Sequence, residues 1–122
     1  MKVLLSIKPE FADKIFDGTK KYEFRKSIFK RKDIRKVVVY ASSPVQQVIG
    51  EFDIEDILCE NTKRLWEITQ EFSGITKQFY DSYFADKEVA FAIQVGNVRR
   101  YSNPKRLSDL DIDFAPQSFA YL

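Results

Sequence analysis

The spacing of hydrophobic residues near the start of the chain predicts a strand followed by a short helix. Residues 3–7 form an apolar run typical of a buried strand. Pro9 suits the first position of a helix, where its missing N–H group costs nothing, and Gly18 suits the residue just after the last turn. One face of the predicted helix carries the apolar residues Phe11, Ala12, Ile15 and Phe16.

Residues 21–25 alternate between charged and aromatic side chains, which predicts a second strand. Successive side chains of a strand point to opposite faces, so we expect the two aromatic residues to enter the core. Glu23 and Arg25 then share the other face, roughly 6.5–7 Å apart. Lys20, in the preceding turn, can reach the same space. Because cations flank the carboxylate, we expect the pKa of Glu23 to be depressed.

Three further strands are predicted after a polar and basic segment at 26–34, which we expect to be an exposed loop. The strands are expected at residues 35–41, at 45–58 with a bend at Gly50, and at 89–101 with a bulge at Gly96. In the last of them, the residues expected to face the core are Val89, Phe91, Ile93 and Val95.

Two helices are predicted between the last two strands. Asn61 or Thr62 can cap the first helix, and its apolar face would comprise Leu65, Ile68 and Phe72. Gly74 separates it from a second helical pattern that contains Phe79, Tyr80, Tyr83 and Phe84. Strands around inserted helices predict the α+β class, closed as a small mixed β-barrel. With no repeat and no linker, we expect one domain over residues 1–122.

Length and composition fit a soluble domain in a reducing compartment. A chain of 122 residues can bury a sizeable core. No apolar run approaches the roughly 20 residues needed to span a bilayer, so we expect no membrane partner, and the first residues turn polar too early for a signal peptide. The single Cys59 cannot form an internal disulfide, which favours a cytoplasmic location.

The formal net charge of +2 is unevenly spread. Residues 1–36 carry 12 Lys or Arg and 5 Asp or Glu, a net charge of +7, whereas residues 37–122 carry 8 and 13, a net charge of −5. A basic N-terminal third suggests a surface that faces a polyanion. The same cations could instead only solvate the loop at 26–34.

Histidine is absent, which excludes Ser-His-Asp and Cys-His machinery, a histidine general base and the usual zinc sites. Acidic residues stand at every second position in two stretches, Glu51-Asp53-Glu55 and Asp109-Asp111-Asp113, and carboxylates are ligands that suit Mg²⁺ or Mn²⁺. Such alternations are more typical of solvated faces. We therefore expect no metal and no cofactor, and any chemistry must use carboxylates, lysines, tyrosines or hydroxyls.

The spacing Gly18-x-Lys20-x-x-Glu23-x-Arg25 resembles the signature of the ASCH domains, which belong to the PUA-like superfamily of small RNA-associated β-barrels. The resemblance extends along the chain, through residues 6–12, 40–44, 49–52 and 115–119. It is strongest to the stand-alone prokaryotic members, often described as predicted transcriptional regulators. It implies a PUA-like mixed barrel with flanking or inserted helices. Because no helix-turn-helix with basic recognition residues is present, we do not expect direct reading of an operator.

The resemblance also implies a cleft at the motif, where Lys8 joins Lys20, Glu23 and Arg25. On the residues alone, such a group of four is more typical of a surface ion-pair cluster that holds the turn. Ser42 and Ser43 are implied to border the same cleft, although hydroxyls at the end of a strand more often cap a turn.

The segment near the C-terminal end of the sequence supplies three further candidates. The amide of Gln117 can read base edges, with Ser118 beside it, and the adjacent Phe119 could stack on a base. Alternatively, this tail could pack only for stability.

Three functions remain open. The leading one is a nucleic-acid-binding module, most typically for RNA, that holds a nucleotide or a single-stranded segment in the cleft. Lys30, Arg31 and Lys32 would then contact the backbone of the nucleic acid. The second is a hydrolase, because the ASCH domains that this chain resembles include amidohydrolases of acetylated cytidine and members linked to RNA cleavage. The third is a role in binding a protein partner. The sequence does not indicate an oligomeric state.

The hydrolase alternative has its own candidate residues. Where the amidohydrolases carry a threonine in the motif, this sequence has Glu23, so that hydroxyl nucleophile is missing and Ser42 is the only replacement nearby. A ribonuclease, acting without metal or assisted by Mn²⁺ or Mg²⁺, would use Glu23 as a base. Lys20 or Arg25 would then stabilise the developing charge.

Overall fold

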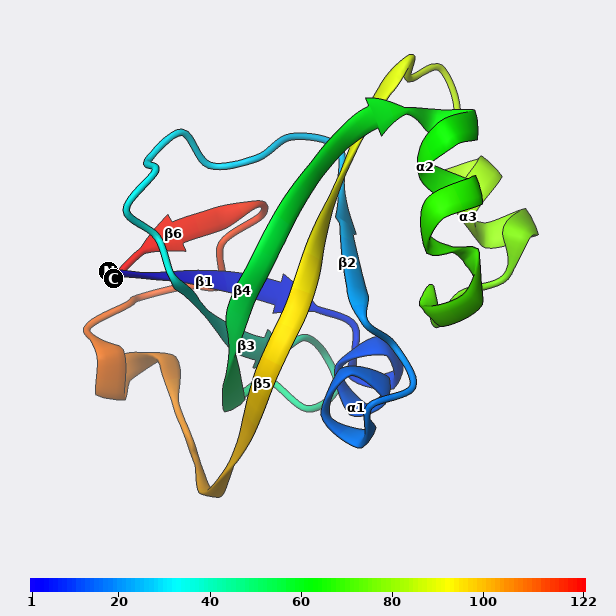
Figure 1. Cartoon of the computed structure of the whole chain (residues 1–122). Coiled ribbons are helices and arrows are strands. Elements are labelled where there is room, and N and C mark those ends of the chain that lie inside the picture. Colours follow the sequence, from blue (N-terminus) through cyan, green and yellow to red (C-terminus); the bar gives the residue numbers. More distant parts are fainter.

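A single six-stranded sheet, curled into an open half-barrel, organises the chain in the computed structural model, which describes residues 1–122 (Figure 1). The strand order is β2-β5-β4-β3-β1-β6. The strands are β1 (Lys2–Ile7), β2 (Tyr22–Arg25), β3 (Lys36–Ala41), β4 (Gln47–Asn61), β5 (Val89–Lys105) and β6 (Phe119–Tyr121). Strands β1 and β3 are parallel, and every other pair is antiparallel. The predicted α+β, PUA-like architecture is thereby confirmed.

Three α-helices flank the sheet, at Pro9–Asp17 (α1), Thr62–Thr69 (α2) and Lys77–Tyr83 (α3). Short 3₁₀ turns occupy Gln70–Phe72 and Leu107–Leu110. Helix α1 follows β1, whereas α2 and α3 lie together beside the C-terminal end of β4 and the N-terminal end of β5 (Figure 1). Asn61 caps α2 through a 2.8 Å bond from the N–H of Arg64 to its Oδ1 atom. No helix is long and apolar enough to cross a membrane.

Three buried clusters cover parts of the sheet, and the smallest consists of Leu4, Val38, Tyr40 and Val48. The largest cluster joins α1 to strands β1, β3, β4 and β5 and consists of Val3, Leu5, Ile7, Ala12, Ile15, Phe29, Ile34, Val37, Val39, Ala41, Ile49, Phe52 and Ile93. The second cluster joins β2 and β5 to α2 and α3 and consists of Phe24, Leu65, Tyr80, Phe84, Ala90 and Ala92. Strand β5 is therefore buried on both faces where the largest and the second cluster meet.

The prediction that Val89 faces the core is wrong, because Val89 is 48% exposed while Ala90 and Ala92 are fully buried. The small alanines pack in the cluster formed with α2 and α3, which the alternation of larger residues could not reveal. Ile93 does face the main core. The predicted bulge near Gly96 is confirmed by a register shift, because Ile54 pairs with Val95 whereas Phe52 pairs with Val98.

Two other local predictions need correction. The helix expected to reach Phe72 ends at Thr69 and continues as a 3₁₀ turn, so Ile68 and Phe72 are exposed and Thr69 takes the buried position. The basic segment at 26–34 is not a simple exposed loop, since Phe29 and Ile34 are buried in the main core.

Gly50 lies where β4 meets both its neighbour and α1. A Cβ atom at this position would lie 2.6 Å from the backbone oxygen of Arg99 and 2.6 Å from Cζ of Phe16. The glycine at which a bend was predicted is the place of a register shift, because the pairing of β4 with β5 shifts between Val48 and Gly50. Only a residue without a side chain permits this close approach.

Candidate functional site

The sharp turn between α1 and β2 places the motif side chains. Gly18 adopts φ 89°, the left-handed conformation that ends α1. The N–H of Lys20 then bonds to the carbonyl of Lys14 (3.0 Å), and the N–H of Lys21 bonds to the carbonyl of Phe72 (2.8 Å). The turn is thus joined both to α1 and to the segment between α2 and α3.

Lys20 points inward, and only 2% of it is exposed. Its Nζ atom donates to the carbonyl of Ser73 (2.6 Å) and lies 5.3 Å and 4.8 Å from the ring centroids of Phe11 and Phe24. Burial lowers the pKa of Lys20 to about 8, although the nearby Glu23 carboxylate favours the charged form. Lys20 therefore holds the segment at Ser73 in place and also has a pKa that burial lowers.

Glu23 and Arg25 pair on one face of β2, as the alternation predicts. Nη1 of Arg25 lies 3.3 Å from Oε2 of Glu23 and 3.5 Å from the carbonyl of Ser6, and Nη2 donates to the carbonyl of Ser118 (2.8 Å). The guanidinium therefore joins β1, β2 and the segment before β6.

The predicted depression of the Glu23 pKa is wrong. Burial raises the pKa of this carboxyl above its ordinary value, and the opposing charges of Lys20 and Arg25 do not outweigh it. Only 7% of Glu23 is exposed, so the carboxylate loses most of its hydration. A buried carboxyl with a raised pKa exchanges protons closer to neutral pH than an exposed one.

These residues open into a cavity of about 280 Å³. Its lining consists of Ser6, Ile7, Lys8, Phe11, Lys20, Glu23, Phe24, Arg25, Ile75, Phe79, Tyr83 and Gln117. The contributions of Phe11, Ile75, Phe79 and Tyr83 were not predicted from the sequence. Phe79 and Tyr83 sit at helical spacing, a pattern that signals a packed helix face without saying whether it borders a cavity.

The other predicted residues are distributed unevenly around the cavity. Lys8 and Gln117 line it and are exposed, whereas Ser118 contributes the backbone carbonyl that Arg25 binds. Ser42 and Ser43 do not line it. The carbonyl of Ser42 accepts the N–H groups of Val45 (3.1 Å) and Gln46 (3.4 Å), as expected of a turn.

Phe119 does not offer a free ring for stacking, because it packs against Phe29 of the main core (ring centroids 6.0 Å apart). In the basic loop, Lys30, Arg31 and Lys32 are exposed and do not line the cavity. The guanidinium of Arg31 is paired with Asp33 through bonds of 3.2 Å and 3.0 Å. This pairing reduces the charge that the loop offers to a polyanion.

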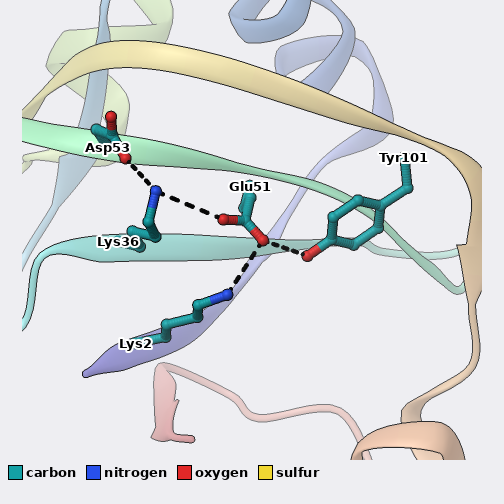
Figure 2. Close-up of polar contacts among 5 residues, drawn as sticks. All are labelled: Lys2, Lys36, Glu51, Asp53 and Tyr101. Carbon is teal, nitrogen blue, oxygen red and sulfur yellow. Dashed lines mark hydrogen bonds and ion pairs between the residues drawn. The ribbon is translucent and has the colours of Figure 1, made fainter.

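The acidic residues at alternate positions of β4 form a solvated face only in part, because Glu51 is buried (Figure 2) whereas Glu55 is exposed. Its carboxylate accepts bonds from Tyr101 (2.8 Å) and Lys2 (3.3 Å), and Lys36 lies 3.7 Å from it while bonding Asp53 at 2.6 Å. Nowhere in the structure do three or more His, Cys, Asp or Glu side chains gather so as to hold a metal ion.

Comparison with known proteins gives consistent matches. The family model described as ASCH domain matches residues 5–99. An ASCH domain-containing ribonuclease of Zymomonas mobilis is 31% identical over 124 residues, covering 99% of this chain and 84% of that protein. The crystal structure of ASCH from Zymomonas mobilis superposes with a TM-score of 0.91 at 30% identity, covering 99% of this chain and 87% of that one.

A further relative is larger than this chain. The large ribosomal subunit protein uL22 of Ureaplasma parvum serovar 3 is 31% identical over 120 residues, which are 98% of this chain. The chain spans 39% of the length of that protein. The likeness therefore concerns one part of the uL22 sequence.

Proposed function

Because the chain belongs to the ASCH domain family, we propose that it binds RNA, with residues 1–122 acting as one domain that holds one nucleotide of a single-stranded segment in the motif cavity. The observation that carries this proposal is the convergence of Lys20, Glu23 and Arg25 on a cavity walled by aromatic rings. Sequence-specific RNA recognition commonly uses this combination of unstacked bases, aromatic side chains and hydrogen bonds to base edges.

The size and lining of the cavity favour a single nucleotide. A volume of about 280 Å³ is near the lower end of the roughly 300–1,000 Å³ found for small-ligand sites. The rings of Phe11 and Phe79 offer apolar surface for a base, while Glu23 and the amide of Gln117 offer acceptors for amino groups. A duplex could not enter such a space, so the proposed ligand is single-stranded.

A second candidate function, RNA cleavage, is favoured by two specific observations. A relative that is similar over nearly the whole chain is named a ribonuclease. In addition, burial moves the pKa values of Lys20 and Glu23 toward neutrality, a perturbation that is common at catalytic sites.

The cleavage would follow from the roles of three side chains. Glu23 would take the proton from a ribose 2′-hydroxyl as that oxygen bonds to the adjacent phosphorus. The bond from phosphorus to the 5′-oxygen of the next nucleotide would break, and a 2′,3′-cyclic phosphate would remain. The 5′-oxygen would take a proton from water, and the resulting hydroxide would take the proton held by Glu23, which restores the carboxylate. Arg25 and Lys20 would stabilise the negative charge that develops on the phosphoryl oxygens.

One experiment tests both functions. Wild-type protein and the isosteric variant Glu23→Gln are incubated with short single-stranded RNAs at low and at physiological salt, and bound RNA and cleavage products are measured together. Glu10→Gln, which changes an exposed glutamate on α1, is the matched control.

The outcomes separate the functions. Salt-sensitive binding without product supports the binding module, and product that disappears only in Glu23→Gln establishes a ribonuclease. RNA binding or cleavage that Glu23→Gln leaves unchanged would show that the cavity is not the site. The absence of both binding and product in the wild type would overturn the proposal and favour a protein partner.

A further inference from the structure

Positive charge gathers at the motif cavity beyond what the motif itself supplies. Lys8, Lys20 and Arg25 line the cavity and face a single carboxylate, that of Glu23. A fourth cation, Lys26, directly follows Arg25 and places its Nζ atom 4.8 Å from the ring centroid of Tyr83, which also lines the cavity. These side chains carry a net charge of +3 when all of them are ionised.

Two of these lysines, Lys8 and Lys26, sit beside the same pair of aromatic rings, and we call them the rim lysines. Phe79 and Tyr83, one turn apart on α3, are nearly parallel, with ring centroids 6.3 Å apart and an angle of 11° between them. Nζ of Lys8 lies 5.1 Å from the centroid of Phe79, and Lys26 takes the equivalent place at Tyr83. Each ammonium thus lies against the face of a ring.

The rim lysines are free to bind an anion. Both are exposed, and neither forms an ion pair with a carboxylate. They come from different segments, Lys8 from the turn before α1 and Lys26 from the residue after β2. By contrast, Lys20 is buried and its ammonium already donates to Ser73.

We infer that the rim lysines bind the two phosphates that flank the nucleotide in the cavity, so that the ligand is an internal nucleotide of a strand and not a free nucleoside. This inference rests on the proposed function. Because the two ammonium groups lie at two neighbouring rings that line the cavity, they match a ligand that carries two anionic groups beside its buried part. An ammonium that packs on a ring also keeps N–H donors for phosphate oxygens.

The RNA phosphates would then contact the rim lysines and not the loop at Lys30, Arg31 and Lys32. Lys26 lies over a ring that lines the cavity, whereas Arg31 lies over Tyr121, which does not line it, and Asp33 neutralises Arg31. The N–H groups of Lys30 and Arg31 bond to the hydroxyl of Tyr121 on β6 (3.1 Å and 3.3 Å), which holds the loop against a different part of the sheet.

The test is a salt titration of RNA binding, measured by fluorescence anisotropy with a short labelled single-stranded RNA. The proteins are wild type, Lys8→Gln, Lys26→Gln and the double variant, with Lys87→Gln as control because Lys87 is exposed, unpaired and outside the cavity lining. For single strands, each phosphate contact contributes about 0.7 to the slope of log K against log salt. Each rim variant is therefore expected to flatten the slope by about 0.7 and the double variant by about 1.4, while Lys87→Gln keeps the wild-type slope.

A second readout compares a trinucleotide with its central nucleoside. Wild type is expected to bind the trinucleotide more tightly, and the double variant is expected to narrow that difference. Equal affinity of wild type for both ligands, or a wild-type salt slope in the double variant, would overturn the inference. In either case, RNA binding that depends on Glu23 would leave the proposed function standing. If wild type binds neither ligand, both proposals fail together.

Discussion

The burial of Lys20 predicts a specific dependence of stability on pH. Its pKa falls from 10.5 to about 8 because the side chain is withdrawn from water. Since one pKa unit corresponds to 1.36 kcal/mol, this difference disfavours the charged form in the folded protein by about 3 kcal/mol. In the unfolded chain, the same lysine returns to an ordinary pKa near 10.5.

The sign follows from the number of protons bound in each state. Between about pH 8 and pH 10.5, Lys20 is largely deprotonated in the folded protein and largely protonated in the unfolded chain. The unfolded state therefore binds more protons, and the free energy of unfolding contributed by Lys20 rises with pH across this window. Below pH 8 both states are protonated, and the contribution stays at its lowest value.

The assay compares wild type with Lys20→Met, which keeps the length of the side chain and removes the charge. Urea unfolding followed by circular dichroism at several pH values between 7 and 10.5 gives the difference in unfolding free energy between the two proteins. This difference is expected to move in favour of wild type by about 3 kcal/mol as the pH rises. A difference that stays flat, or that moves the other way, would refute the reasoning.

Lys14→Met is the matched control for this measurement. The Nζ atom of Lys14 also donates to a carbonyl of the segment after α2, that of Gly74 (3.2 Å), but Lys14 is exposed. Because both lysines bind neighbouring carbonyls and differ in burial, the pH dependence is expected only at Lys20. If the stability difference depends equally on pH for Lys20→Met and Lys14→Met, the pH dependence arises from the carbonyl contacts and not from burial.

Two further predictions concern stability away from the cavity. Gly50→Ala would place a methyl group 2.6 Å from the backbone oxygen of Arg99, so we expect the free energy of unfolding to fall by about 1–3 kcal/mol. Urea unfolding would show this as a lower midpoint with an unchanged m-value. An unchanged midpoint would show that the two strands can move apart without cost. Tyr101→Phe removes the 2.8 Å bond to the buried carboxylate of Glu51, and a loss of about 1.5–3 kcal/mol is expected at neutral pH. Burial opposes ionisation of Glu51, but the bonds from Tyr101 and Lys2 lower the pKa of this carboxyl overall. The loss of stability in Tyr101→Phe should therefore shrink as acid protonates Glu51. A loss that does not depend on pH would contradict this account.

The parts of the fold that depend on local chemistry could be predicted from the sequence. Pro9 and Gly18 mark the two ends of α1 because each has a backbone preference that needs no partner elsewhere in the chain. The alternation at residues 22–25 placed Glu23 and Arg25 on one face of β2, and the structure pairs them at 3.3 Å.

The remaining features depend on which elements meet in space. Ala90 and Ala92 carry no strong pattern, yet α2 and α3 bury them against β5. Glu51 belongs to an acidic alternation that is usually solvated, but Lys2 and Tyr101 come from other strands to neutralise and bind it. For the same reason, burial by distant segments decided the direction of the pKa shift at Glu23, which its neighbours in sequence could not show.

The fold by itself accounts for the spacing of the motif. Gly18 turns the chain so that Lys20 can hold the carbonyl of Ser73, and a Cβ atom on Gly74 would lie 2.5 Å from the stem of that lysine. Arg25 likewise joins two strands and the segment before β6 through backbone carbonyls. The contacts that hold the turn and the cavity that we propose as the ligand site therefore share Lys20, Glu23 and Arg25. Because side chains that the fold already fixes lose little freedom when they bind, a structural role for the motif makes it better suited to hold a nucleotide.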